Sequence, residues 1–325
     1  VSMAVKNGLA VPELLLAAPD IAQAENEDIS GVSTPEKGVV RIGMLQDLSR
    51  PVEVIGGQCS DGLWQTLPGG LRIWTLELRS LGALGQRFHL APLDLPPGAD
   101  LRVFDADEPG ETYGPFSSAE DFWTPTCFGE GVVLECQVPQ QCDLSAVHII
   151  LDQTTYNYQD VGQLAKSGSC NIDVSCHDNW RTTSLGVGGI GTIGNTGVLW
   201  CTGSLITDAD TSTFVPYFLT ANHCIGGQSA AQTIEVYWLY QTDECGGAVP
   251  NSASVPRTTG GADFLMGNSL SVQGTDFTLL RLRQNPPAGL VYLGFHTGPI
   301  QLNSSVACIH HPDGDFKHIS FGHSV

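Results

Sequence analysis

The sequence predicts an all-β protein built from two successive domains, and three observations support this prediction. Short apolar runs with alternating side chains, such as LRIWTLEL and TIEVYWLYQ, recur from Val39 onward, and such alternation is typical of half-buried strands. Turn residues close many of these runs, as in LPGG, LPPGAD and DEPGE, which interrupt regular structure. The chain has 325 residues, a length that fits about two domains of ordinary size.

The change of pattern along the chain predicts four segments. Residues 1–38 are mixed, acidic and poorly periodic, which favours a loose N-terminal segment. Residues 39–160 contain regularly spaced short strands and predict a β-sandwich. Residues 161–166 form a linker, and residues 167–325 again carry strand patterns without sustained helical spacing, which predicts an antiparallel barrel.

Charge and cysteine content exclude several classes of function. Fourteen basic against thirty-four acidic residues give a formal charge of −20, which argues against nucleic acid and anionic membranes as partners and favours a soluble monomer. No apolar run reaches the roughly 18 residues of a membrane span. The ten cysteines include no CxxC pair, so we expect disulfides of an oxidising compartment rather than a zinc site.

The stretch VPYFLTANHCIGG holds the first candidate for chemistry, His223. A strand that ends at Thr220 delivers this histidine to the rim of a sheet, and Cys224 can fix the backbone directly after it by pairing with Cys201. A histidine that acts as a general base needs a carboxylate to orient it. Asp276, directly ahead of the strand pattern FTLLRL, is the candidate for that carboxylate.

TANHC resembles the segment around the catalytic histidine of chymotrypsin-like serine proteases, and DFTLL resembles the segment of their aspartate. With SGSCNIDVSC, CTGSLI, VYWLYQTDEC and ACIHHP in this order, residues 167–320 resemble the bacterial lysyl endopeptidases. Residues 39–160, with LPPGADLRVF and YGPFSSAEDFWTP, resemble the propeptide domain of such enzymes. The resemblance implies a double β-barrel serine endopeptidase, made as a secreted zymogen of a bacterium and exported through the periplasm. It would cleave protein or peptide substrates after lysine or another basic residue.

The resemblance also implies residue roles. His223 would serve as base and acid, and Asp276 would orient it. The family's bridges match Cys176 with Cys245 and Cys201 with Cys224, whereas Cys308 departs from its pattern and either captures Cys170 or stays free. We expect the remaining cysteines to pair within the propeptide, in an order that the sequence leaves open: Cys59, Cys127, Cys136 and Cys142.

The family's nucleophile lies in a GSSGSP or GDSGGP segment, and this sequence contains neither. Ser320 and Ser324 lack the glycine neighbours that build an oxyanion hole. We therefore expect the serine and the specificity pocket to lie beyond Val325, so that the second barrel is incomplete and this chain alone is inactive. The alternative is a non-enzymatic protein in which the β-sandwich binds or inhibits a partner.

Two further features complete the expectations. Lys166 is one of only four lysines and precedes Ser167 at the joint, so an enzyme that cleaves after lysine would process itself there and release an intramolecular propeptide. The histidine-rich run IHHPDGDFKHISFGH matches no standard zinc spacing. We expect no metal and no cofactor.

Overall fold

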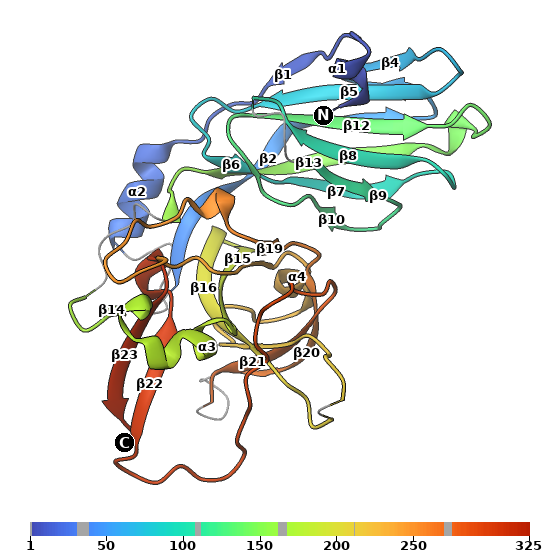
Figure 1. The fold of residues 1–325 in the computed structure, drawn as a ribbon. Helices are drawn as coiled ribbons and strands as arrows, with labels where there is room; N and C mark the ends of the chain where they lie inside the picture. Colours follow the sequence, from blue (N-terminus) through green and yellow to red (C-terminus); the bar gives the residue numbers. More distant parts are fainter. Residues whose placement is uncertain (1, 31–38, 108–111, 162–167, 211, 270–274) are drawn as a thin grey trace. The chain divides into compact units, whose positions relative to one another are not determined.

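The computed structural model describes residues 2–30, 39–107, 112–161, 168–210, 212–269 and 275–325 (Figure 1). Strands dominate these residues, so the all-β prediction is confirmed. The chain divides into two compact units: residues 1–25 with 43–158 form unit 1, and residues 26–42 with 159–325 form unit 2. Among the described residues, no helix is long and apolar enough to cross a bilayer.

Unit 1 contains two sheets with a shared core, and their strands run antiparallel except for β1, which pairs in parallel with β5. The first sheet has the order β1-β5-β12-β8-β9, with β4 also paired to β5. The second places β10, β7, β13 and β2 side by side, with β3, β6 and β11 at its margins. The bounds of the first set are β1 Glu13–Leu15, β4 Leu63–Thr66, β5 Arg72–Arg79, β8 Asp100–Asp105, β9 Thr112–Phe116 and β12 Gly131–Val138. Those of the second are β2 Val40–Ile55, β3 Gln58–Cys59, β6 Gly85–Gln86, β7 Phe88–Asp94, β10 Phe122–Trp123, β11 Cys127–Phe128 and β13 His148–Asn157.

The core of unit 1 shows why these strands form a sandwich. Trp74, Leu76 and Leu78 alternate along β5 and are almost completely buried, and they belong to one apolar cluster with Leu90 and Leu151 of the second sheet. Side chains that alternate along a strand point to the same face. The alternation therefore places one apolar face of each sheet against the other.

The N-terminal residues are ordered parts of the fold, and the expectation of a loose segment is wrong for residues 2–30. The backbone amides of Met3 and Ala4 donate hydrogen bonds to the fully buried carboxylate of Glu135, at 3.1 and 3.0 Å, and the Ser2 hydroxyl binds the same group. Helix α1 (Met3–Lys6) starts there, and β1 pairs in parallel with β5. These partners lie more than 60 residues away in sequence, so the local composition carried no sign of them.

Unit 2 is built around one curled antiparallel sheet with the order β19-β18-β15-β16-β17-β21-β20. Its core cluster includes Ile190, Phe218, Trp238 and Leu280, which the strands bury on their concave face. Trp238 is fully buried. The bounds are β15 Val187–Gly194, β16 Gly197–Ile206, β17 Tyr217–Thr220, β18 Glu235–Tyr237, β19 Arg257–Thr258, β20 Ala262–Asn268 and β21 Phe277–Leu282.

The last part of unit 2 is a three-stranded antiparallel sheet in the order β14-β23-β22. Its strands are β14 Ile172–Asp173, β22 Ser305–His310 and β23 His318–His323. The α-helices among the described residues are α1, α2 (Ile21–Ser30), α3 (Arg181–Ser184) and α4 (Gln228–Ala231). Helix α2 spans the division between the two units.

Candidate active site

Strand pairing brings His223 and Asp276 to one edge of the curled sheet. β17 and β21 run antiparallel with Thr220 opposite Thr278. His223 follows the end of β17 by three residues, and Asp276 precedes β21 by one. In an antiparallel pair the end of one strand lies beside the start of the other. Residues 53 positions apart in sequence therefore meet at this edge of the sheet.

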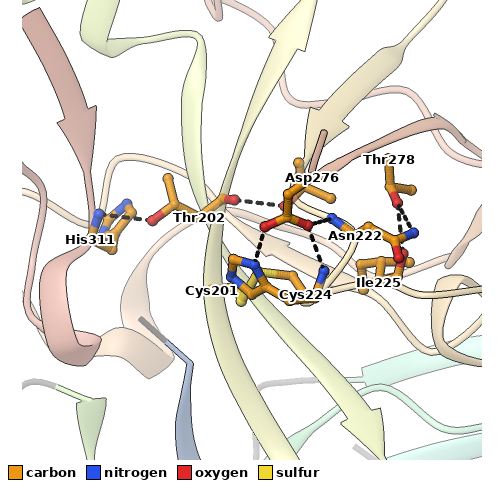
Figure 2. Close-up of a disulfide and its surroundings, with 10 residues drawn as sticks. Cys201, Thr202, Asn222, Cys224, Ile225, Asp276, Thr278 and His311 are labelled. Atoms are coloured by element: carbon orange, nitrogen blue, oxygen red, sulfur yellow. Dashed lines mark hydrogen bonds and ion pairs between the residues drawn. A yellow bond between two sulfur atoms is a disulfide. The ribbon is translucent and has the colours of Figure 1, made fainter. Parts of the chain in front are cut away.

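The Asp276 carboxylate is held on both oxygens. Oδ2 lies 2.5 Å from Nδ1 of His223, while Oδ1 accepts hydrogen bonds from the backbone amides of Asn222 at 2.8 Å and His223 at 3.1 Å (Figure 2). Burial acts to raise the pKa of Asp276, but these hydrogen bonds from His223 and Asn222 outweigh it and lower the pKa below its ordinary value. The group is thus a fixed anion at neutral pH.

The contact with Asp276 determines which imidazole nitrogen carries the proton. An ionised carboxylate can only accept a hydrogen bond, so Nδ1 of His223 must donate. In the neutral ring the lone pair then resides on Nε2, which is the tautomer that a general base requires. Orientation and tautomer are both set by a single acidic residue.

Polar contacts on the neighbouring residues fix the turn that carries His223. The Asn222 side-chain amide donates to Oγ1 of Thr278 at 3.1 Å, and this hydroxyl donates to the carbonyl of Ile225 at 2.8 Å. Thr220 donates to the carbonyl of Thr202 on β16 at 2.8 Å. These hydrogen bonds connect the turn to the strands on both sides, so they fix the backbone that carries the imidazole.

A disulfide between Cys201 and Cys224 also fixes this turn, with Cα atoms 6.2 Å apart and a sequence separation of 23 residues (Figure 2). It ties β16 to the residue directly after the histidine. The two sulfurs and the His223 ring lie close enough to suggest a metal site. Metal coordination by cysteine requires thiolates, and both sulfurs are consumed in the disulfide. These three residues are therefore a disulfide that fixes the backbone beside His223.

His223 faces a hollow of about 650 Å³ that is also lined by residues of the region after β21. Asn171, His310, His311 and Asp313 contribute to its wall. Burial lowers the pKa of His310 below its ordinary value, and nearby His318 acts in the same direction, whereas Asp313 opposes them. The hollow offers room for a peptide segment beside the imidazole.

The wall of the hollow contains a buried group that sequence reasoning missed. The backbone amide of His311 donates to Oγ1 of Thr202 at 2.9 Å. The imidazole of His311 stacks on the ring of Tyr240, with centroids 5.8 Å apart. Nδ1 of His311 donates to the carbonyl of Asp315, while Nε2 is buried without a hydrogen-bond partner among the described residues. Burial holds the pKa of His311 well below its ordinary value, so the ring is neutral.

Lys317, whose charge also lowers the pKa of His311, is completely buried. Its Nζ donates to the carbonyl of Ser184 at 2.8 Å and to Oε1 of Gln241 at 3.0 Å. Burial lowers the pKa of Lys317 to about 7. Lysine is rarely buried, so no sequence pattern could have identified this position.

The structure also bears on a serine that the sequence analysis set aside and on the predicted processing site. Ser320 donates to Oδ1 of Asn171 at 2.7 Å and lies 3.4 Å from Nε2 of His310, so its contacts are with the wall of the hollow. Lys166 and Ser167, the predicted processing site, lie outside the described residues.

The cysteines divide into two groups. A second disulfide joins Cys176 and Cys245, which are 69 residues apart. The sequence analysis expects four cysteines to pair within the propeptide. In the structure these four cysteines are thiols. Cys170 and Cys308 are exposed thiols. The thiols of unit 1 are Cys59, Cys127, Cys136 and Cys142.

Comparison with known proteins identifies the family. The family model of the lysyl endopeptidase C-terminal domain matches residues 164–325, and the model of the lysyl endopeptidase N-terminal domain matches residues 15–157. The chain belongs to the lysyl endopeptidase family. This places both units in one family of peptidases, with the His223 site in the C-terminal domain.

A curated relative agrees with this assignment. Lysyl endopeptidase from Pseudomonas aeruginosa is 30% identical over 242 residues, which cover 69% of this chain and 50% of the relative. The chain thus spans about half the length of the curated relative it matches. The resemblance found in TANHC and DFTLL is confirmed at the level of the family.

Proposed function

We propose that the chain is part of the precursor of a secreted serine endopeptidase, in which His223 is the general base and acid and Asp276 orients it. One observation carries the proposal: Nδ1 of His223 lies 2.5 Å from a carboxylate that two backbone amides hold in place. This is the geometry that fixes the tautomer and stabilises the imidazolium formed when a hydroxyl is deprotonated.

The serine is the part of this mechanism that the sequence does not contain. No GxSGxP segment occurs in the 325 residues, and the chain covers half of its relative. We propose that the nucleophile and oxyanion hole belong to a part of the protein outside this sequence. The 325-residue chain by itself then has no peptidase activity.

A pair of assays tests this proposal. The 325-residue chain should show no turnover of a lysyl ester, and the complete protein should show turnover that His223→Ala removes. Turnover by the 325-residue chain that His223→Ala abolishes would contradict the missing nucleophile. A complete protein without activity, but with tight binding of a protein partner, would favour the binding or inhibitory function instead.

We propose cleavage after lysine, and self-processing between Lys166 and Ser167. The support is the lysyl specificity printed in the relative's name, together with the scarcity of lysine in the chain. N-terminal sequencing of the mature secreted protein should return SGSCNIDV. A different start, or the same start in a His223→Ala protein expressed alone, would count against self-processing.

Secretion and a monomeric state are further parts of the proposal. Two disulfides suit an oxidising compartment, and the formal charge of −20 favours a soluble monomer. The partners are then protein or peptide substrates and the molecule's own propeptide. Fractionation of a producing bacterium, followed by gel filtration of the medium, tests location and state together.

A further inference from the structure

Thr202 joins the two sheets of unit 2 beside the candidate base. The residue belongs to β16 of the curled sheet and directly follows Cys201, whose disulfide fixes the turn of His223. His311 directly follows β22 of the three-stranded sheet. Oγ1 of Thr202 accepts a hydrogen bond from the backbone amide of His311 at 2.9 Å. One hydroxyl therefore connects the sheet that carries His223 to the three-stranded sheet.

The backbone of Thr202 contacts the other side of the candidate site. Its carbonyl accepts a hydrogen bond from Oγ1 of Thr220 at 2.8 Å, and Thr220 is the last residue of β17, three positions before His223. In Figure 2 the hydroxyl of Thr202 points toward His311 and its carbonyl points toward the side of Asp276. The same residue thus contacts both the strand that presents the base and the wall of the hollow.

Residues 310–313 form this wall, and we call them the wall segment. The pairing of β22 with β23 ends at His310, and the amide of His311 binds Thr202 instead of a neighbouring strand. Asp313 adopts the left-handed backbone region with a φ of 49°, which costs free energy unless the surrounding structure holds it. The hydrogen bond to Thr202 is therefore one of the contacts that give the wall segment its shape.

We propose that Thr202 is a positioning residue, whose hydroxyl fixes the wall segment relative to His223 and so sets where the substrate lies against the base. This proposal rests on the proposed function for the identity of the reaction. His310 and Asp313 line the hollow from the wall segment, and His223 lines it from the turn after β17. A substrate that contacts both sides is placed by the Thr202 hydrogen bond, and a displacement of about 1 Å can lower a rate about 100-fold.

The chain after the wall segment has separate contacts that should survive the loss of this hydrogen bond. The backbone amide of Lys317 donates to the carbonyl of Tyr240 at 2.9 Å, and its Nζ donates to the carbonyl of Ser184 at 2.8 Å. Thr202→Val keeps the branched shape of the side chain and removes the hydroxyl. We therefore expect this change to displace the wall segment without unfolding unit 2.

The kcat of the complete peptidase with a lysyl peptide substrate is the first measurement. Thr202→Val should lower kcat at least about tenfold, because the substrate is presented to the base less precisely. Thr202→Ser keeps the hydroxyl and should restore kcat to nearly the wild-type value. A wild-type kcat in Thr202→Val, or an equal loss in Thr202→Ser, would overturn the proposal.

A matched control separates positioning from stability. Thr258 of β19 is buried in the same unit, and its Oγ1 accepts a hydrogen bond from Nε1 of Trp238 at 2.9 Å. Thr258→Val removes this acceptor in the core rather than at the hollow. It should lower the free energy of unfolding and leave kcat unchanged. A loss of kcat as large as that in Thr202→Val would assign the effect to stability and overturn the proposal.

Hydrogen exchange in the 325-residue chain tests the contact without any activity. The amide of His311, followed by NMR, should exchange at least about tenfold faster in Thr202→Val than in wild type, whereas Thr258→Val should leave it unchanged. Unchanged exchange in Thr202→Val would overturn the proposal even if the complete protein is an active peptidase. Faster exchange, together with turnover that His223→Ala leaves intact, would support the contact and contradict the proposed function instead.

Discussion

The chain contains two histidines that contact aspartates, and their surroundings differ. In unit 2, Nδ1 of His223 contacts Asp276, whose carboxylate is also bonded by two backbone amides. In unit 1, both ring nitrogens of His89 contact carboxylates: Nδ1 lies 2.7 Å from Asp152 and Nε2 lies 2.9 Å from Asp121. Each ring nitrogen of His89 is thus occupied by a carboxylate of the protein.

The support of the two carboxylates differs as well. Asp276 is 18% exposed and sits in a turn braced by a disulfide, whereas Asp152 and Asp121 are 39% and 52% exposed. His89 also stacks on Trp123, with ring centroids 4.9 Å apart. The comparison teaches that a contact with aspartate does not by itself make a histidine a candidate general base. The carboxylate must be held in place and bound to one ring nitrogen, and the ring must face a hollow.

The largest expected effect is on kcat, and it differs between substitutions of the two histidines. In the complete peptidase, His223→Ala should lower kcat about 10⁴-fold or more, because the base and its orientation are lost together. His89→Ala should leave kcat unchanged, since this ring lies in the sandwich. Steady-state turnover of a lysyl ester is the measurement. Equal losses in the two variants would break the distinction drawn between them.

The second effect concerns the disulfide beside His223. The double change Cys201→Ser with Cys224→Ser should lower the free energy of unfolding of unit 2 by about 3 kcal/mol, the value expected for closing a loop of this length. Urea denaturation under oxidising conditions measures it. Cys170→Ser, which changes an exposed thiol, is the matched control and should have no effect on stability.

The third effect concerns the buried side-chain amine of Lys317 in unit 2. The folded-state pKa of Lys317 is about 7, below the value of about 10.4 in an unfolded chain. Between these values the unfolded chain binds a proton that the folded chain does not, so stability rises with pH from about 7 to about 10. Lys317→Met should remove a rise on the order of a few kcal/mol.

The free energy of unfolding, measured in urea at several pH values, gives this slope. Lys6→Met, at an exposed lysine of α1, is the control and should keep the slope of the wild type. A slope that is the same in Lys317→Met and wild type would show that the buried amine does not titrate in this range.

The smallest expected effect is the loss of stability at low pH that comes from protonation of Asp276. Its pKa is lowered in the folded state, so its contribution to stability is present above the unfolded value of about 3.9 and is lost as the pH falls through the lower folded value. Asp276→Asn should therefore reduce the loss of stability below about pH 4. Asp152→Asn, at the more exposed carboxylate beside His89, is the matched control variant. Urea midpoints measured between pH 2 and 6 compare the two variants.

Much of the candidate site could be predicted because its signals are local. The apolar run before Thr220 and the run after Asp276 indicate strands by their own periodicity, and a strand end predicts where the next polar side chain emerges. The order TANHC then DFTLL therefore predicted a contact that the structure has at 2.5 Å. The role of His311 could not be predicted, because its partners, Thr202 and Tyr240, are more than 70 residues away in sequence.

The sequence by itself determined the all-β class, the sandwich and curled-sheet patterns, and the pairing of His223 with Asp276, because alternation and strand ends are properties of neighbouring residues. Tertiary structure alone decided that Ser2 binds Glu135, that Arg41 donates a hydrogen bond to the turn between β15 and β16, and that Lys317 is buried. In each of these cases a polar group has a partner far away in sequence. Its burial is favourable only once that partner is in place, so no local pattern carries the information.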